Sequence, residues 1–182
     1  MSTLPHVTAV LAECGLIDAT WFKDYDMERG TATHKACEYL DQDDLQIDSL
    51  DDAVMRRVTQ YQRFKNEMRP EILAIEADVR HASLSYVGRL DRVVRLSSVV
   101  GILDIKGPSQ APWTGLQTCA YLRAWNSDAV ANPTALRRWS LHLSDDNYKL
   151  VEHTSRRDWP AFQAALTLYR WKENHGCLKK SS

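Results

Sequence analysis

The chain has 182 residues, of which 44% are hydrophobic and 26% are charged, and its formal net charge is -1 with a pI of about 6.6. These values predict one globular domain with its own core and exclude an intrinsically disordered chain. The near-neutral charge does not by itself indicate a nucleic-acid binder, but it leaves room for local basic patches.

The beginning of the chain, Met1 to Ala12, lacks the basic start and long apolar run of a signal peptide. No stretch of the sequence is apolar for long enough to cross a bilayer. We therefore expect a cytoplasmic protein with no membrane partner. Its cysteines form no C-x-x-C pair and are expected to be buried: Cys14, Cys37, Cys119 and Cys177.

The first half of the chain is predicted to be helical. Gly30 is expected to break the chain, and residues 31–40 are expected to form a helix after it. A second helix is predicted over residues 50–68, and Pro70 ends it. This helix is indicated by apolar residues at helical spacing: Ala53, Val54, Val58, Tyr61 and Phe64.

Beyond Pro70 the pattern changes to that of strands, which are predicted over residues 72–79 and 84–96. Residues 99–105 form a nearly continuous apolar run with one carboxylate in it, which is typical of a strand buried on both faces. Glycine and prolines then predict a loop over residues 107–113.

The rest of the chain alternates again between helix and strand. A helix is predicted over residues 115–126 and a last helix over 161–174. Between them, residues 135–143 and 148–153 are predicted to form a hairpin, and residues 176–182 a frayed tail. Together the elements predict an α/β fold, in which helices flank a mixed β-sheet in a single domain.

Asp91, Asp104 and Lys106 are the residues of this pattern that indicate chemistry. Side chains of a strand alternate between its faces, so Asp104 and Lys106 share a face. A two-residue turn at Ser97 and Ser98 would place Asp91 beside Asp104, with Cβ atoms about 5 Å apart. A register change of one residue would separate them. The pairing is a geometric hypothesis, because the turn itself is not readable from the sequence.

Two neighbouring carboxylates on buried strands are costly unless a cation neutralises them. Oxygen ligands favour Mg²⁺ or Mn²⁺, and a nearby lysine ammonium could activate water or stabilise charge on a phosphate. The set therefore predicts metal-dependent cleavage of phosphodiester bonds. The alternative is a surface ion pair between Asp104 and Lys106, which the surrounding apolar run disfavours.

Four sequence elements occur in a fixed order: a glycine before a helical histidine, then G-x-x-D, D-x-K and Q-x-x-x-Y. They correspond here to Gly30 with His34, Gly88 to Asp91, Asp104 to Lys106, and Gln117 to Tyr121. This order resembles the nuclease domain of the RecB family within the P-D-(D/E)-x-K superfamily, which includes phage exonucleases. The resemblance covers a little over half of the chain, and it implies a restriction-endonuclease-like fold with a core over about residues 29–174.

The resemblance also implies a set of metal ligands. Asp91 and Asp104 would bind Mg²⁺ or Mn²⁺, with help from His34 and the backbone carbonyl of Ile105. Glu76 resembles an extra acidic ligand that some members carry, and a solvated strand residue is an equal alternative for it. For His34 the alternative is a packing, capping or helix-face contact.

The remaining motif residues are implied to be catalytic. Lys106 would be the catalytic lysine. Gln117 and Tyr121, four residues apart on one helix face, would orient the lysine, the strand or the DNA backbone. The alternatives are that Gln117 is only a polar residue of the helix face and that Tyr121 belongs to the core. Trp113, in the loop after the lysine, could stack on a base. Phosphate contacts are expected from arginines that flank Asp91, namely Arg89, Arg92 and Arg95.

Two departures from the family are visible. Gly107 follows the lysine, where the family often has threonine. Some relatives hold an iron–sulfur cluster with one early and three late cysteines, whereas only Cys177 lies near this C-terminus. We therefore expect no such cluster.

The leading hypothesis is a DNA nuclease, and in particular an exonuclease, used in phage or bacterial recombination, replication or repair. The chain has no Walker motif, so it would act alone or as a small partner of another protein, in an oligomeric state that the sequence leaves open. One alternative is a DNA-binding or interaction module that keeps the nuclease fold without cleavage. An unrelated metal hydrolase is more remote, because histidine-rich ligand sets are missing.

Overall fold

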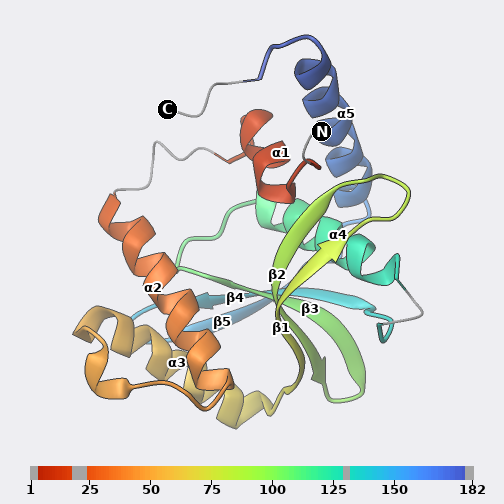
Figure 1. The fold of residues 1–182 in the computed structure, drawn as a ribbon. Coiled ribbons are helices and arrows are strands. Elements are labelled where there is room, and N and C mark those ends of the chain that lie inside the picture. The colour runs from red at the N-terminus through yellow and green to blue at the C-terminus, as the bar shows by residue number, and fades with distance from the viewer. Residues whose placement is uncertain (1–3, 18–23, 129–131, 179–182) are drawn as a thin grey trace.

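A computed structural model describes residues 4–17, 24–128 and 132–178. Its centre is one five-stranded mixed sheet with helices on both faces (Figure 1). Within these ranges, none of the helices combines the length and apolar character that a bilayer span requires.

The strands follow one another across the sheet in chain order. Neighbouring strands are antiparallel, except that β3 and β4 are parallel. Helix α4 makes the connection that this parallel pair requires. The strands are β1 (Glu71–Arg80), β2 (Val87–Leu96), β3 (Val99–Lys106), β4 (Arg137–Leu143) and β5 (Tyr148–Glu152).

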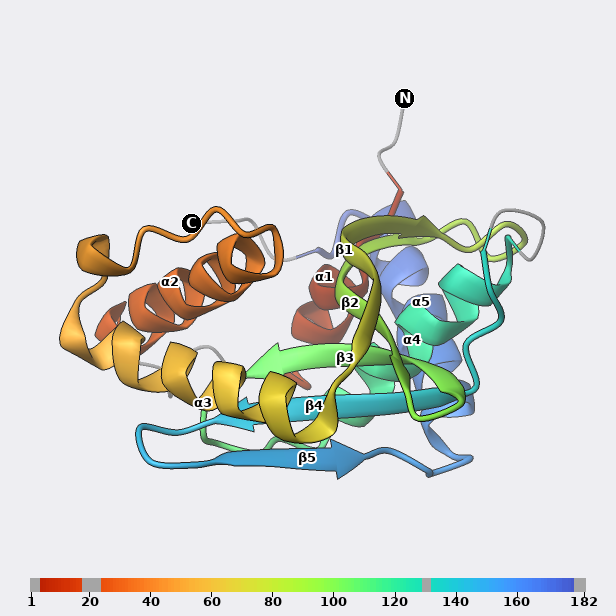
Figure 2. The ribbon, with the colours of Figure 1, turned by 90° about the horizontal axis from the view of Figure 1, so that it is seen from below.

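The helices form two groups, one on each face of the sheet. Figure 2 shows α2 and α3 together on one side and α1, α4 and α5 on the other. A short 3-10 helix, Ile47–Ser49, lies between α2 and α3. The helices are α1 (Val7–Glu13), α2 (Asp24–Asp41), α3 (Asp52–Met68), α4 (Trp113–Asn126) and α5 (Asp158–Asn174).

Strand β3 is covered on both faces, as its apolar run predicts. Ile102 packs in the cluster formed with α1, α4 and α5. Leu103 and Ile105 pack in the opposite cluster, with α3 residues Tyr61 and Phe64. Asp104 and Lys106 alternate with these residues, so they belong to the face that carries α4.

Helix α3 confirms the prediction over residues 50–68. The side chain of Asp51 accepts a 2.8 Å hydrogen bond from the backbone N–H of Val54 and caps its first turn. At the other end, Arg69 adopts a left-handed conformation with φ 46°, and Pro70 prevents the helix from continuing.

Several predictions about the elements were wrong. Helix α2 runs through Gly30 without a break, because a single glycine inside a helix costs only about 1 kcal/mol. Strand β2 begins at Val87 rather than residue 84, since Ser85 takes a left-handed turn conformation with φ 45°. Helix α1 was not predicted, and Cys177 is exposed rather than buried. The predicted frayed tail extends beyond the described residues.

Candidate active site

The β2–β3 hairpin places two carboxylates beside each other. Its turn lies at Ser97 and Ser98, and Arg92 pairs with Leu103, which is the predicted register. Asp91 and Asp104 occupy the next positions of this register. The Asp91 carboxylate accepts a 2.6 Å hydrogen bond from the backbone N–H of Ile105, so it is held against the strand that carries Asp104.

Asp104 is buried and is paired with the lysine of its own strand. Its Oδ2 atom lies 2.7 Å from Nζ of Lys106, and its side chain is only 1% exposed. The lysine ammonium also lies 5.2 Å from the ring centroid of Trp113, within the range of a cation–π interaction. Lys106 is therefore fixed between a carboxylate and an aromatic ring at the start of α4.

Burial makes both carboxyl groups harder to ionise. Desolvation raises the pKa of Asp91 above its ordinary value and raises the pKa of Asp104 to about 6. The Lys106 ammonium opposes this shift in both groups, while the charge of Asp91 adds to it at Asp104. The two carboxylates share one lysine, so a second positive charge would favour their ionised form.

Glu76 brings a third carboxylate to this region from β1. Its neighbours Ile75 and Ala77 pair with Arg92 and Leu90, which places Glu76 opposite Asp91. Glu76 has φ 46°, a left-handed backbone conformation that is unfavourable for residues other than glycine. Burial raises its pKa, and the charge of Asp91 raises it further. A strained residue beside two desolvated carboxylates is typical of a functional site.

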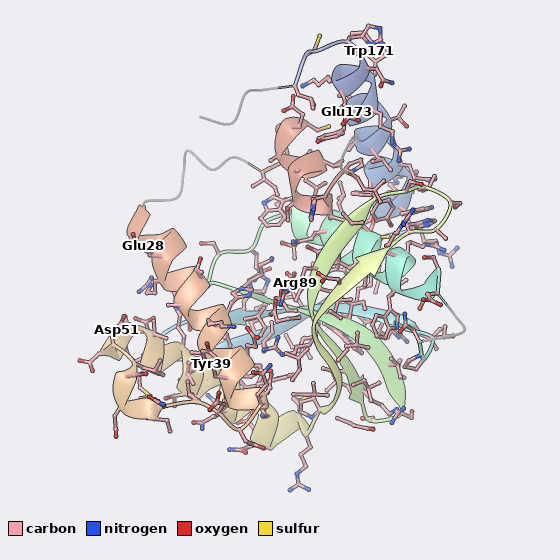
Figure 3. The ribbon with its side chains drawn as sticks, viewed as in Figure 1. Glu28, Tyr39, Asp51, Arg89, Trp171 and Glu173 are labelled. Atoms are coloured by element: carbon pink, nitrogen blue, oxygen red, sulfur yellow. The ribbon has the colours of Figure 1, made fainter. Side chains whose placement is uncertain are left out.

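Two arginines of β2 neutralise Glu76. Arg89 Nε lies 3.2 Å from it and Arg92 Nη1 lies 3.1 Å from it. Figure 3 shows Arg89 at the centre of the view, where β2 passes between α2 and α4. Arg89 is 58% exposed and is therefore accessible to a ligand.

Arg92 is completely buried, which makes the predicted phosphate contact wrong for this residue. It lies 2.6 Å from Asp41, at the end of α2, and Asp41 also binds Lys65 and the hydroxyl of Tyr61. Arg92 thus ties the carboxylate cluster to both helices on its own face of the sheet. Arg95 pairs with Glu71 at the far end of the hairpin.

His34 reaches the cluster from α2. Its Nδ1 atom lies 3.4 Å from Oδ2 of Asp91. Burial lowers the pKa of His34, and the charge of Lys106 lowers it further, so the neutral imidazole is favoured at neutral pH. Its possible helix-face partner, Glu38, pairs with Lys35 instead.

Gln117 and Tyr121 face the sheet from α4. Nε2 of Gln117 donates a 3.1 Å hydrogen bond to the Tyr121 hydroxyl, and both residues are buried. Burial raises the pKa of Tyr121, and the nearby charge of Asp104 adds to the shift. A Cβ atom at Gly88 would lie only 2.6 Å from the Tyr121 ring, so this glycine lets the ring approach β2.

A buried polar network behind the site was not predicted. Ser140, level with Asp104 on β4, lies 2.9 Å from an imidazole nitrogen of His142 and 2.9 Å from one of His153. The other ring nitrogen of His142 lies 3.1 Å from the carbonyl oxygen of Gly107. This network holds the chain just after Lys106. No sequence motif marks these residues, since their contact depends on the β3–β4 register.

The chemistry of the donor set suits a hard divalent cation, because the set offers carboxylate oxygens and a neutral imidazole. In the part of the chain that the structure describes, no three His, Cys, Asp or Glu side chains are yet arranged to hold a metal ion. The carboxylates of Asp104 and Glu76 are instead turned to Lys106, Arg89 and Arg92. Binding would require some of these ion pairs to open.

Comparison with known proteins yields similarity of fold only. No family model matches the chain, and no curated protein matches its sequence. Among solved structures, a candidate exonuclease from Eubacterium rectale is similar with a TM-score of 0.60 and 6% identity, over 97% of this chain and 83% of that one. An alkaline exonuclease from Laribacter hongkongensis gives a TM-score of 0.46 and 12% identity over 96% and 89%, which is too distant to support an argument. The chain has the α/β fold of the first of these structures.

Proposed function

We propose that this chain is a metal-dependent nuclease that hydrolyses phosphodiester bonds in DNA, and that residues 1–182 form one nuclease domain. The observation that carries the proposal is the meeting of the buried Asp104 with the partly buried Asp91 and Lys106 between α2 and α4. Two desolvated carboxylates and one ammonium are suited to hold a cation and a phosphate together. The fold shared with the Eubacterium rectale protein supports the same interpretation.

Asp91 and Asp104 would hold Mg²⁺ or Mn²⁺, with the Ile105 carbonyl, His34 and Glu76 as further ligands. When bound, such a cation polarises the phosphate and lowers the pKa of water. The residues themselves would orient and present the ligand atoms. Asp91 is oriented by the N–H of Ile105, and the lowered pKa of His34 keeps a nitrogen lone pair available.

Lys106 would stabilise the negative charge that develops on the phosphate during cleavage. Its ammonium lies against Asp104 and Trp113, so it would turn from the Asp104 carboxylate to the phosphate when a cation takes its place on Asp104. Groups that are fixed before the reaction stabilise a transition state more effectively than mobile ones. Gln117 and Tyr121 would act as positioning residues, because their hydrogen bond fixes the face of α4 that borders the carboxylates.

The further details of the proposal follow from the family resemblance. We propose exonuclease action, in recombination, replication or repair of phage or bacterial DNA in the cytoplasm, alone or with a partner protein. The exposed Arg89 is the arginine of β2 best placed for a phosphate contact. Trp113 remains a candidate for stacking on a base, although its ring lies close to the Lys106 ammonium.

One observation favours a second candidate, a DNA-binding module without cleavage. The carboxylates of Asp104 and Glu76 are occupied by cationic side chains, and no three-donor group is formed among the described residues. A protein that kept this arrangement when DNA bound would not recruit a metal.

Incubation with linear and circular DNA, single- and double-stranded, in Mg²⁺, Mn²⁺ or EDTA separates these functions. The proposal predicts cleavage in Mg²⁺ or Mn²⁺, none in EDTA, and none by Asp104→Asn, with linear DNA cut in preference to circular DNA. RNA of the same sequence tests the sugar preference. Binding without cleavage in either metal would establish the second candidate.

A further inference from the structure

A polar cavity lies on the side of α4 that faces away from the candidate active site. Its volume is about 650 Å³, and it is bordered by α4, the start of β4, the segment after β5 and the start of α5. Cys119 and Arg123 line it from α4. With 3.6 residues per turn, these positions face away from Gln117 and Tyr121. The cavity is therefore separate from the candidate active site.

The cavity is strongly basic, although the chain as a whole is not. Its lining includes Arg123, Arg137, Arg138 and Arg156 and only one acidic residue, Glu152. Glu152 pairs with Arg137, and Asp158 pairs with Arg138 at 2.8 Å. Across the described ranges, neither Arg123 nor Arg156 has a carboxylate within ion-pair distance. Two positive charges are thus left uncompensated around one cavity.

Two of the basic groups, Arg123 and Arg138, are held in place before any ligand arrives. The guanidinium carbon of Arg123 lies 5.3 Å from the centroid of the Trp159 ring, and stacking of this kind leaves the N–H groups at its edge available. Arg138 donates hydrogen bonds to the carbonyl oxygens of Gly115 at 2.6 Å and Ser155 at 2.9 Å. Its buried side chain thereby joins α4 to the segment before α5 and fixes that side of the cavity.

We infer that this cavity binds a phosphate group of a nucleic-acid strand outside the catalytic centre. Arginine N–H groups match phosphate oxygens in geometry as well as charge. The identity of the occupant rests on the proposed function, because a nuclease substrate supplies phosphates at regular intervals. Helix α4, about 10 Å in diameter, separates the cavity from the site, so a phosphate held in the cavity would lie outside the catalytic centre.

The test is the salt dependence of DNA binding, measured by fluorescence anisotropy with Ca²⁺ in place of Mg²⁺. The slope of log K against log salt is negative, and each lost phosphate contact reduces its magnitude by roughly 0.9. Arg156→Ala should lower it by about one such step, and Arg123→Ala with Arg156→Ala by about two. Arg156 is exposed, so its replacement by alanine should cost little stability. The control is Arg69→Ala, which removes an exposed arginine from the end of α3 and should leave the slope unchanged.

Slopes that are equal in the wild type, both variants and the control overturn the inference. Titration with inorganic phosphate, followed by NMR of the tryptophan indole N–H signals, distinguishes the source. One outcome is saturable phosphate binding that is lost in the double variant while the salt slope of DNA binding does not change. It would mean that the cavity holds free phosphate, and it too would overturn the inference that the cavity binds nucleic acid. Cleavage in Mg²⁺ is scored separately. If the slopes change but the protein never cuts DNA, the cavity binds a DNA phosphate and the proposed nuclease function is wrong. If the protein cuts DNA and the slopes do not change, only the phosphate site in the cavity is contradicted.

Discussion

Asp91 is joined to Ile105 by a 2.6 Å hydrogen bond in which the backbone N–H donates to the carboxylate. Ile105 lies between Asp104 and Lys106 on β3, so this bond fixes one carboxylate relative to the other two functional groups. The position of Asp91 therefore depends on the hairpin register rather than on a flexible loop. A site built on paired strands is more rigid than one built on loops.

The first prediction concerns the metal. Asp91→Asn and Asp104→Asn should each weaken Mn²⁺ binding by at least tenfold and abolish cleavage, because each removes an anionic ligand. Isothermal titration calorimetry measures the affinity. Asp146→Asn, on the exposed β4–β5 turn, is the matched control and should bind Mn²⁺ like the wild type. If both active-site variants keep the wild-type affinity, the metal lies elsewhere.

The second prediction concerns stability and pH in metal-free buffer. Burial raises the pKa of Asp104 from 3.8 to about 6. The folded state therefore binds the carboxyl proton of Asp104 more tightly than the unfolded state does. Protonation of Asp104 stabilises the fold below pH 4, and this stabilisation is lost as pH rises through 6. Between pH 4 and pH 8, the wild type should therefore lose up to about 3 kcal/mol of unfolding free energy relative to Asp104→Asn.

Urea denaturation of both proteins across this pH range measures the difference. Mn²⁺ should reverse it at pH 8, because the cation stabilises the wild type and not the variant. A difference between the two proteins that is constant with pH would mean that Asp104 ionises as an ordinary exposed carboxyl group.

The third prediction concerns Gln117. Its hydrogen bond to Tyr121 is buried, and we expect Gln117→Ala to lower turnover at least tenfold while DNA affinity changes little. Melting temperature is measured in parallel, with Gln163→Ala on α5 as the control for a helical glutamine. A loss of turnover that is no larger than the loss of folded protein would make Gln117 purely structural.

The fourth prediction contrasts two glycines. A Cβ atom at Gly101 would lie 2.3 Å from the Trp139 ring and 2.6 Å from the backbone oxygen of Arg137, so Gly101→Ala should destabilise the protein by about 1–3 kcal/mol. At Gly30 a Cβ atom meets nothing within 4 Å, and Gly30→Ala should stabilise α2 by up to about 1 kcal/mol. Urea denaturation of both variants checks the contrast; equal effects would mean that β3 and β4 do not pack this closely.

The sequence predicted the part of the site that depends on short-range geometry. Strand alternation predicted that Asp104 and Lys106 share a face. A two-residue turn predicted the β2–β3 register that brings Asp91 beside Asp104. Helix α3 was predicted because its apolar spacing and its terminating proline are both local signals. The roles of the site residues in catalysis and metal binding stay predictions.

What the sequence did not reveal depends on contacts between distant segments. Arg92 resembled a surface arginine, but its partner Asp41 lies 51 residues earlier in the chain. The contact of Ser140 with His142 and His153 requires β4 to lie parallel to β3, a pairing that crosses α4. Propensity also failed at Gly30, because the packing of α2 outweighs the cost of one glycine.

The most direct test of nuclease activity at this site is Lys106→Ala. The ammonium would act mainly in the transition state, so its loss should lower turnover without much change in substrate affinity. Loss of one such group typically costs on the order of 10²–10³-fold in rate. DNA binding is measured by gel shift in Ca²⁺ and cleavage in Mg²⁺, on a variant shown to be folded by its melting transition. We expect Lys106→Ala to bind DNA almost as well as the wild type and to cut it hardly at all. Cleavage by Lys106→Ala at the wild-type rate would show that the lysine takes no part in catalysis.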